Sequence, residues 1–296
     1  VLHYQPKVNM RTGDVIGVEA LIRWEHPQKG LVQPNNFLPI IEEHPLCISI
    51  GEWVMRSAFE QLQHWQSIGV KIPISINISA LQLLSSNFIN QFEKILLEFP
   101  KVNPSFIEVE ILETSKLEDL SKASNVINHC NKLGIHFSLD DFGTGYSSLT
   151  YLKQLAITYI KIDQSFVRDM LEDPNDLAIL EGVIKLSDAF QIQVIAEGVE
   201  TIEHGRTLIQ LGCELAQGYV IARPMPSDAF PDWLTTWQPD SSWTTQRVIT
   251  DDEAKILFAT VEHRAWIANL DAYLKGKINN FGKVARYKGR FIFHII

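Results

Sequence analysis

Apolar residues along this chain recur with two different spacings. Stretches in which every second residue is apolar predict strands, and stretches in which apolar residues recur every three or four positions predict helices. The predicted strands are residues 2–10, 15–24, 73–79, 106–112, 135–142, 158–163, 192–199 and 214–221, and the predicted helices between them are 50–67, 86–99, 117–133, 148–155, 176–190, 203–211 and 228–237. Strand and helix thus alternate along most of the chain, which is typical of a parallel sheet.

The number of strand–helix units decides between two α/β architectures. About seven or eight units in roughly 240 residues fit a (β/α)8 TIM barrel better than an open sheet. An open, doubly wound sheet would also place a glycine-rich fingerprint directly after its first strand, and the sequence has none there. We therefore expect a TIM barrel whose chemistry lies at the C-terminal ends of the strands.

The pattern changes after Pro239. Apolar residues recur at helical spacing from Asp251 to Lys275, and the residues after Asp271 include basic side chains but no acidic one. We therefore predict a barrel domain over residues 1–239 and a C-terminal helical extension over residues 240–296. The predicted helix packs either on the barrel or on a second subunit, and its role is left open.

Charge differs between these two parts of the chain. Residues 1–239 carry 17 Lys and Arg against 29 Asp and Glu, a net charge of −12, whereas residues 240–296 carry 9 against 6, a net charge of +3. A polymeric nucleic acid needs a basic binding face, so the acidic barrel argues against such a partner. A phosphate substrate is compatible with this charge only where metal ions supply positive charge locally.

Cysteine usage and hydropathy bear on the compartment. Cys47, Cys130 and Cys213 lie far apart in apolar surroundings, without metal-ligand spacing. They predict buried thiols in a reducing compartment, which indicates the cytoplasm. The sequence has no signal peptide and no apolar run of the roughly 18–20 residues that a membrane span needs. Because Val1 stands almost inside the first predicted strand, we expect the chain to be part of a longer protein, either soluble or membrane-anchored.

Most of the predicted strands end in polar side chains. These residues are Glu19, Asn77, Glu110, Glu113, Asp140, Asp141, Lys161, Asp163, Glu197, Glu200 and Gln217. Because the C-terminal ends of barrel strands meet on one rim, we expect these side chains to converge. Hard oxygen ligands of this kind favour Mg²⁺ or Mn²⁺, whereas zinc would usually recruit His or Cys.

The adjacent Asp140 and Asp141 are the centre of this pattern. Side chains of a strand point alternately to opposite faces, so both aspartates reach one site only where the chain bends. Two like charges held close together are costly unless a cation lies with them. A solvated, aspartate-rich turn is the alternative interpretation, and the number of other strands with polar ends argues against it. Lys161 is either a charge partner that orients water or phosphate, or part of a structural salt bridge.

Eight short motifs, in this order and spacing, resemble the EAL family of bacterial cyclic di-GMP phosphodiesterases. They are residues 4–6, 19–24, 77–79, 110–113, 140–148, 161–163, 197–200 and 217–219, and the match extends over about residues 2–235. Leu112 departs from the Thr of many members, but it is not a ligand position. The resemblance implies a barrel variant whose first strand runs antiparallel, which agrees with the hairpin predicted for residues 2–24.

The resemblance also implies a metal centre with two Mg²⁺ or Mn²⁺ ions bridged by Asp140. Glu19, Asn77 and Glu110 would complete one metal site, and Asp141 and Glu197 would complete the other. Lys161 would position and activate the attacking water, so that Glu19, Lys161 and Glu197 form the catalytic set.

Substrate contacts are implied in the same way. Arg23 would hold a phosphate of the substrate, Leu21 would pack on the nucleotide, and Glu200 and Gln217 would complete the rim. Glu113 would anchor the loop over residues 142–148, which in this family couples metal binding to the dimer interface.

The function implied by the resemblance is metal-dependent hydrolysis of cyclic di-GMP to linear pGpG. A homodimer and an upstream sensory or GGDEF domain would accompany it. A receptor that only binds cyclic di-GMP is the main alternative, and a structural output domain without ligand is the second. Members that only bind the nucleotide usually lose the metal ligands or the glycine loop, and this sequence retains both.

Overall fold

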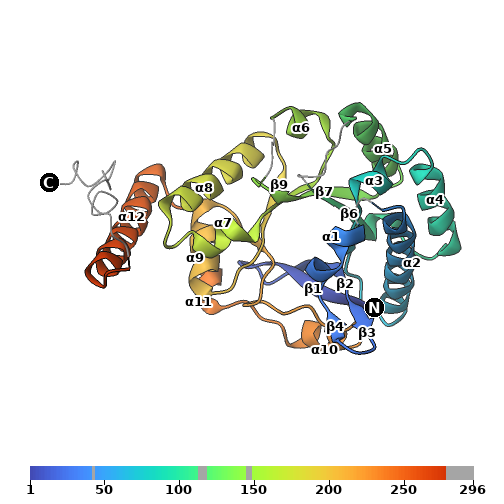
Figure 1. Cartoon of the computed structure of the whole chain (residues 1–296), viewed down its shortest axis with the longest axis horizontal. Coiled ribbons are helices and arrows are strands. Elements are labelled where there is room, and N and C mark those ends of the chain that lie inside the picture. The colour runs from blue at the N-terminus through green and yellow to red at the C-terminus, as the bar shows by residue number, and fades with distance from the viewer. Residues whose placement is uncertain (42–43, 113–118, 145–148, 278–296) are drawn as a thin grey trace.

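The computed structural model describes residues 1–41, 44–112, 119–144 and 149–277. Its centre is a closed barrel of eight strands surrounded by helices (Figure 1). The barrel strands are β1 (Leu2–Asn9), β2 (Val15–Ile22), β5 (Ile74–Asn77), β6 (Ile107–Leu112), β7 (His136–Phe142), β8 (Tyr159–Ile162), β9 (Gln193–Ala196) and β10 (Leu215–Ala216). The predicted (β/α)8 barrel is therefore confirmed.

The strand order around the barrel is β1-β10-β9-β8-β7-β6-β5-β2. The pairs from β2 through β5, β6, β7, β8 and β9 to β10 are parallel, whereas β1 pairs antiparallel with both β2 and β10. This is the barrel variant with an antiparallel first strand that the resemblance implied. It places the C-terminal ends of the parallel strands on one rim.

Apolar and polar side chains alternate along the barrel strands. The apolar side chains face outward, and the surrounding helices pack on them. On β6, Ile107, Val109 and Ile111 belong to the hydrophobic core, while Glu108 and Glu110 lie on the other face, inside the barrel. The longer surrounding helices are α2 (Leu46–Ser67), α4 (Phe88–Glu98), α5 (Leu120–Lys132), α8 (Pro174–Ala189), α9 (Ile202–Leu211) and α10 (Ala229–Thr236). Shorter elements are η1 (Pro34–Asn36), α1 (Leu38–Ile41), α3 (Ala80–Leu83), η2 (Pro104–Phe106), α6 (Leu149–Gln154), α7 (Gln164–Asp169) and α11 (Ser241–Thr244).

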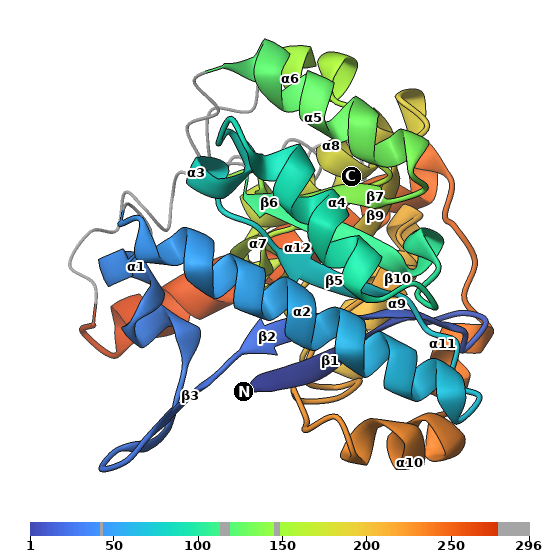
Figure 2. The same ribbon diagram turned by 90° about the vertical axis from the view of Figure 1, so that its right-hand side faces the viewer.

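The second predicted strand is shorter than expected. Residues 15–24 do not form one strand, because β2 ends at Ile22 and Trp24 begins a separate hairpin of β3 (Trp24–His26) and β4 (Gly30–Val32). Figure 2 shows that this hairpin projects away from the barrel. Its Trp24 is half exposed and packs edge-on against Phe37, which stabilises the hairpin outside the main core.

The last predicted strand is also shorter, since residues 214–221 keep only β10 as a strand. The chain beyond it turns where Gly218 approaches the chain near Val199: a Cβ atom at Gly218 would lie 2.2 Å from the Val199 carbonyl oxygen. Only glycine fits such an approach. The turn places Gln217 at the barrel rim, next to the segment that follows β9.

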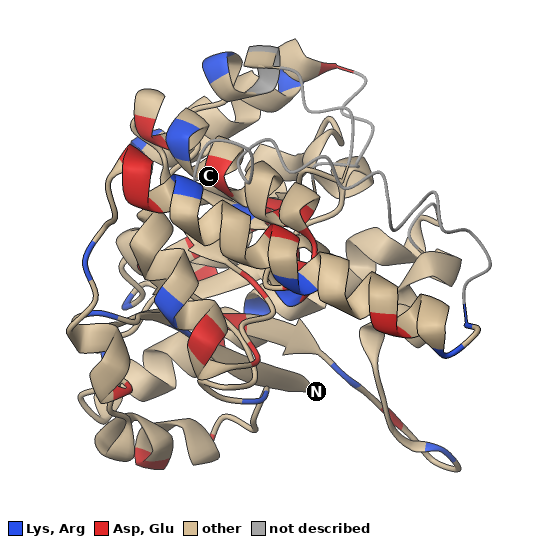
Figure 3. Cartoon of the chain, turned by 90° about the vertical axis from the view of Figure 1, so that its left-hand side faces the viewer, with Lys and Arg blue, Asp and Glu red and all other residues tan. Residues whose placement is uncertain are grey.

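The helix predicted for the extension is α12 (Asp251–Leu274), which packs on α8. Thr250 and Glu253 form a capping box at its start, and Ala254, Val261 and Ala265 are buried. Figure 3 shows the acidic first turn of α12, the end at which acidic side chains interact favourably with the helix dipole. The helix therefore packs on the barrel within this chain, while the domain limit at residue 239 stays a prediction.

Among the described residues, no helix is both long enough and apolar enough to cross a membrane.

Candidate active site

The rim formed by the C-terminal ends of the strands gathers carboxylates around one buried ammonium. Lys161 on β8 is fully buried, and its Nζ contacts four carboxylate oxygens: 3.3 Å to Glu19, 2.6 Å to Glu110, 3.2 Å to Asp140 and 2.6 Å to Glu197. These partners come from β2, β6, β7 and the segment directly after β9. The tertiary structure therefore unites residues that lie as far apart as positions 19 and 197.

Asp140 and Asp141 both reach this site because β7 bends between them. The register of β7 on β8 shifts between Leu139 and Phe142, and Asp141 adopts the left-handed conformation at φ 55°. A non-glycine residue rarely occupies this region, and such conformations cluster at functional sites. The Asp141 amide N–H donates to Asp140 Oδ1 at 3.0 Å, which stabilises the bend.

Amide side chains fix the orientation of Glu19. Asn77 Nδ2 donates to Glu19 Oε1 at 2.7 Å, and Gln217 Nε2 donates to Glu19 Oε2 at 2.7 Å. Gln217 Nε2 also donates to Gln5 Oε1 at 3.0 Å, and Gln5 in turn donates to the Ala222 carbonyl at 3.0 Å. Glu19 therefore presents its carboxylate to the centre in a defined orientation, and the bond from Asn77 uses the amide nitrogen of that side chain, not its oxygen.

Two groups of carboxylates have the geometry of cation sites. Glu19, Glu110 and Asp140 each offer an oxygen within 4.8 Å of the others, and so do Asp140, Asp141 and Glu197. Asp140 belongs to both groups. A donor set made only of oxygen atoms fits hard divalent cations, and a carboxylate shared by two groups is the arrangement expected of a two-metal centre.

Burial and mutual repulsion shift the pKa values of these carboxyl groups. Burial, with the charges of Glu110 and Glu19, raises the pKa of Asp140 to about 6. Burial, followed by Asp140 and Asp163, raises the pKa of Asp141 to about 7. Burial and Asp140 likewise raise the pKa of Glu197 well above its usual range. Each raised pKa indicates a charge that lacks sufficient compensation, which a bound cation would supply.

Glu110 behaves differently because two ammonium groups contact it. Burial opposes its ionisation, but Lys161 and Lys7 outweigh burial and lower the pKa of Glu110 to about 2. Burial opposes the charge of Lys161, but the four carboxylates that contact its Nζ outweigh burial and raise the pKa of Lys161 well above its usual range. Lys161 is therefore protonated at neutral pH. Lys161 is therefore a hydrogen-bond donor in this site, and it is not available as a base.

The raised pKa of Asp141 predicts a pH-dependent stability of the metal-free protein. The unfolded-state pKa of an aspartate is about 3.9. The folded state therefore binds the Asp141 proton more tightly than the unfolded state does, and this group lowers stability as pH rises from about 4 to about 7. We expect Asp141→Asn to raise the melting temperature in EDTA at pH 7.5 and to have little effect at about pH 4.5. Scanning calorimetry of both proteins at each pH measures this difference. A constant difference across that range would contradict the assignment.

Two predicted substrate-binding residues, Leu21 and Arg23, lie near the end of β2 and directly after it. The Arg23 side chain is buried, and its guanidinium donates to the Ile22 carbonyl at 2.9 Å. Glu19 and Tyr219 exert electrostatic effects on Arg23, although burial outweighs them and lowers its pKa. Leu21 directly follows Ala20 near the end of β2 and is half-buried. Arg23 thus lies close enough to Glu19 to sense its charge, and the substrate-binding roles of Arg23 and Leu21 stay predictions.

One predicted residue, Glu200, does not join the centre in the described part of the chain. Glu200 is exposed beyond Val199, and the structure brings it close to His204, not to the carboxylates around Lys161. Glu113 lies outside the described residues, as does the loop over residues 145–148. The anchoring role of Glu113 therefore stays a prediction.

Three polar residues inside the barrel were not predicted as site residues. Gln5 supports Gln217, while Lys7 contacts Glu108 at 2.9 Å and Glu110 at 3.2 Å. The sequence pattern could have predicted Lys7 and Glu108 inside the barrel, because Glu108 lies two positions before Glu110 and therefore on the same face of a strand. Both residues lie before the ends of their strands, whereas the predicted site residues lie at strand ends.

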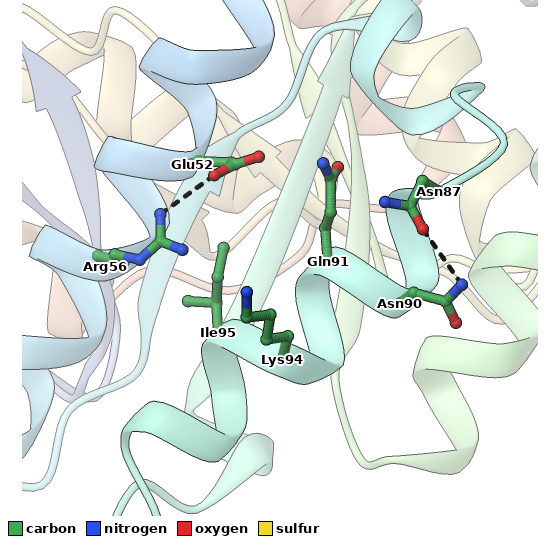
Figure 4. Close-up of a pocket in the computed structure, with 7 residues that line it drawn as sticks. All are labelled: Glu52, Arg56, Asn87, Asn90, Gln91, Lys94 and Ile95. Atoms are coloured by element: carbon green, nitrogen blue, oxygen red, sulfur yellow. Dashed lines mark hydrogen bonds and ion pairs between the residues drawn. The ribbon is translucent and has the colours of Figure 1, made fainter.

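A separate pocket lies outside the barrel, between α2 and α4 (Figure 4). Glu52 and Arg56 on α2 form an ion pair of 3.2 Å at one side, and Asn90 donates to Asn87 at 3.2 Å at the other. Glu52 is the one carboxylate among the lining residues. This pocket therefore does not compete with the barrel rim as a cation site.

The fold and this centre define a TIM-barrel protein with a carboxylate site of the kind that binds divalent cations. The EAL domain family model matches residues 1–224. The chain belongs to the EAL domain family.

Curated relatives and a solved structure agree with this assignment. The chain is 40% identical over 229 residues to the bifunctional diguanylate cyclase/cyclic di-GMP phosphodiesterase MucR of Pseudomonas aeruginosa, a match that covers 77% of this chain and 33% of MucR. It is 38% identical over 235 residues to the cyclic di-GMP phosphodiesterase PdeR of Escherichia coli, covering 79% of this chain and 35% of PdeR. The solved PaMucR phosphodiesterase in complex with c-di-GMP is 40% identical, with a TM-score of 0.74, and the match covers 78% of this chain and 93% of that one. The chain thus spans about a third of the length of these two curated relatives.

Proposed function

We propose that this chain hydrolyses cyclic di-GMP to linear pGpG with the help of two divalent metal ions. The observation that carries this proposal is the pair of carboxylate groups that share Asp140 beside the buried Lys161. The names of MucR and PdeR, and the nucleotide bound in the PaMucR structure, support the choice of substrate.

The oxygen donors of the site favour Mg²⁺ or Mn²⁺ as the ions. Glu19, Asn77, Glu110 and Asp140 would hold one ion, and Asp140, Asp141 and Glu197 would hold the other. When bound, the two ions would activate the attacking water and neutralise charge on the phosphate oxygens.

The protein's own side chains would orient the reaction. Lys161, which stays protonated, would donate a hydrogen bond to the attacking water, and Glu197, the most exposed of its four partners at 18%, would accept from the water on the open side of the site. Arg23 would hold a phosphate of the substrate, and Leu21 and Gln217 would contact the nucleotide. The water oxygen forms a new bond to phosphorus while the bond from phosphorus to O3′ breaks, and the proton of the water passes to the departing oxygen.

Removal of divalent ions should abolish the reaction. After exhaustive dialysis against EDTA, we expect no hydrolysis, and addition of Mg²⁺ or Mn²⁺ should restore it. Ca²⁺ should suppress it, because its larger and looser coordination disfavours the geometry of in-line attack. Chromatography of the nucleotides after incubation measures each condition. Full activity after chelation would exclude the two-metal mechanism.

A receptor that binds cyclic di-GMP without hydrolysis is the alternative that uses the same pocket. Incubation with cyclic di-GMP and Mg²⁺, followed by chromatography, separates the two functions, because only the enzyme forms pGpG. Calorimetric titration with cyclic di-GMP in EDTA then separates a receptor from a structural domain that binds no nucleotide.

The proposal also includes an upstream domain, an oligomeric state and a cellular location. MucR is named as a diguanylate cyclase as well as a phosphodiesterase and is about three times as long as the matched segment, which supports an upstream GGDEF or sensory domain here. A homodimer and a cytoplasmic location are proposed from the family resemblance and the sequence pattern, as is a helical extension over residues 240–296 whose role is left open.

A further inference from the structure

We propose that Lys7 is a positioning residue of the metal centre, which it serves by holding Glu110 from inside the barrel. This inference rests on the proposed two-metal function. Lys7 lies on β1 and is 1% exposed, and its Nζ lies 2.9 Å from Glu108 Oε2 and 3.2 Å from Glu110 Oε1.

The contact spans the interior of the barrel. In the strand order, β1 and β6 are separated by β2 and β5 on one side, so Lys7 reaches Glu108 and Glu110 across the barrel interior and not along a shared strand edge. Gly17, the register partner of Lys7 on β2, leaves room for the lysine stem, since a Cβ atom there would lie 3.3 Å from Lys7 Cε. The barrel thus accommodates this long side chain beneath the rim.

Glu110 is held at both of its oxygens by different lysines. Lys161 contacts Oε2 at 2.6 Å from the rim, and Lys7 contacts Oε1 at 3.2 Å from below. Lys161 lies within ion-pair distance of four carboxylates from four different segments, whereas the contacts of Lys7 are with two neighbouring carboxylates of one strand. Lys7 is therefore suited to fix the orientation of Glu110 while a cation binds at the rim.

Glu108 makes this arrangement dependent on Lys7. Its Oε2 is paired with Lys7, while its Oε1 is buried and has no hydrogen-bond partner among the described residues. Without Lys7, two buried carboxylates on one face of β6 would repel each other without an intervening cation, and such burial is strongly unfavourable. The repulsion is relieved when Glu110 leaves the orientation seen here, which removes a ligand from the centre.

The test compares metal affinity with stability in Lys7→Met. Titration with Mn²⁺ alone, followed by electron paramagnetic resonance of the free ion, gives the affinity without any need for turnover. Loss of a residue that orients a metal ligand typically weakens metal binding by roughly 10–100-fold, and we expect a rise of that size in Kd for Mn²⁺. At saturating Mn²⁺, kcat and KM for cyclic di-GMP should approach the parent values. Lys185→Met, which removes an exposed lysine on α8, is the matched control and should leave the affinity unchanged.

The double variant Lys7→Met with Glu108→Gln separates positioning from charge balance. It removes one positive and one negative charge, so the net charge inside the barrel is that of the parent. We expect it to recover the melting temperature that Lys7→Met loses but to keep the weakened Mn²⁺ affinity, because Glu110 still lacks its lower partner. Should Lys7→Met fail to fold, the double variant carries the comparison.

Two results would overturn this inference. One is a folded Lys7→Met that binds Mn²⁺ within threefold of the parent or more tightly, and the other is parental affinity in the double variant. Failure of the proposed hydrolysis is a different result: a parent that binds Mn²⁺ but forms no pGpG still allows the comparison of affinities.

Discussion

Asp140→Asn should abolish hydrolysis of cyclic di-GMP, with an expected loss in kcat on the order of 10³-fold or more. Asp140 is the carboxylate that both candidate cation groups share, so this substitution removes one charged ligand from each of them at once. Asparagine keeps the size of the side chain and retains one acceptor oxygen, so the effect reports charge and ligation and not a cavity. Chromatographic assay of pGpG formation, at several Mg²⁺ concentrations, measures the loss.

The matched control is Asp169→Asn, which changes an exposed aspartate at the end of α7 that pairs with Arg168. It should retain parental turnover and stability within experimental error, because exposed ion pairs contribute little. Mn²⁺ titration should also report a weaker or missing second ion in Asp140→Asn. Turnover of Asp140→Asn within tenfold of the parent would contradict the shared-ligand assignment.

Lys161→Met should lower kcat by roughly 10²–10³-fold while leaving KM for cyclic di-GMP little changed. The ammonium of Lys161 is fully buried among four carboxylates. Its interaction with the attacking water should strengthen toward the transition state, and such an interaction is expressed in kcat. Methionine keeps much of the length of the lysine stem, so the substitution removes the charge with little loss of packing.

Removal of Lys161 should also affect the metal-free protein. Four carboxylates would lose their common partner, and loss of one member of a buried ion pair typically costs about 3–5 kcal/mol. We expect a lower melting temperature for Lys161→Met in EDTA and partial recovery when Mg²⁺ is added. Because of this effect, kinetic comparison is made at saturating Mg²⁺.

Arg23→Ala supplies the contrast for Lys161→Met. A side chain that holds a phosphate does so in the bound substrate as well as in the transition state, so its loss should raise KM more than it lowers kcat. Steady-state kinetics of the two variants therefore test both role assignments together. If Lys161→Met weakened nucleotide affinity and left kcat unchanged, the two assignments would be wrong.

The periodicity of apolar residues determined the elements and their order. The strand–helix alternation predicted a barrel, and the polar strand ends predicted Glu19, Glu110, Asp140, Lys161 and Glu197 as neighbours, which the structure brings together. This succeeds because burial of one strand face is a local requirement on sequence, and because parallel strands in a barrel end on the same rim. The prediction of Mg²⁺ or Mn²⁺ rests on the donor atoms alone.

Strand boundaries were less predictable. Residues 15–24 have the composition of one strand, yet β2 ends at Ile22, and residues 214–221 retain only β10. Beyond these strands the chain makes tertiary contacts, such as Gly218 against Val199 and Trp24 against Phe37. Local propensity does not contain such contacts.

Only the tertiary structure decided how charge is arranged inside the barrel. The sequence by itself determined that Asp140 and Asp141 could share a site only at a bend, and the folded chain places that bend at Asp141, in the left-handed conformation. The sequence also contained Lys7 and Glu108, but their pairing joins strands that are not neighbours and depends on how the barrel closes. Glu200 carried the same motif signal as Glu197 and lies exposed away from the centre, because β9 ends at Ala196 and the chain turns after Glu197. A sequence pattern specifies the face on which a side chain lies, whereas its partner across the barrel is set by closure of the whole sheet.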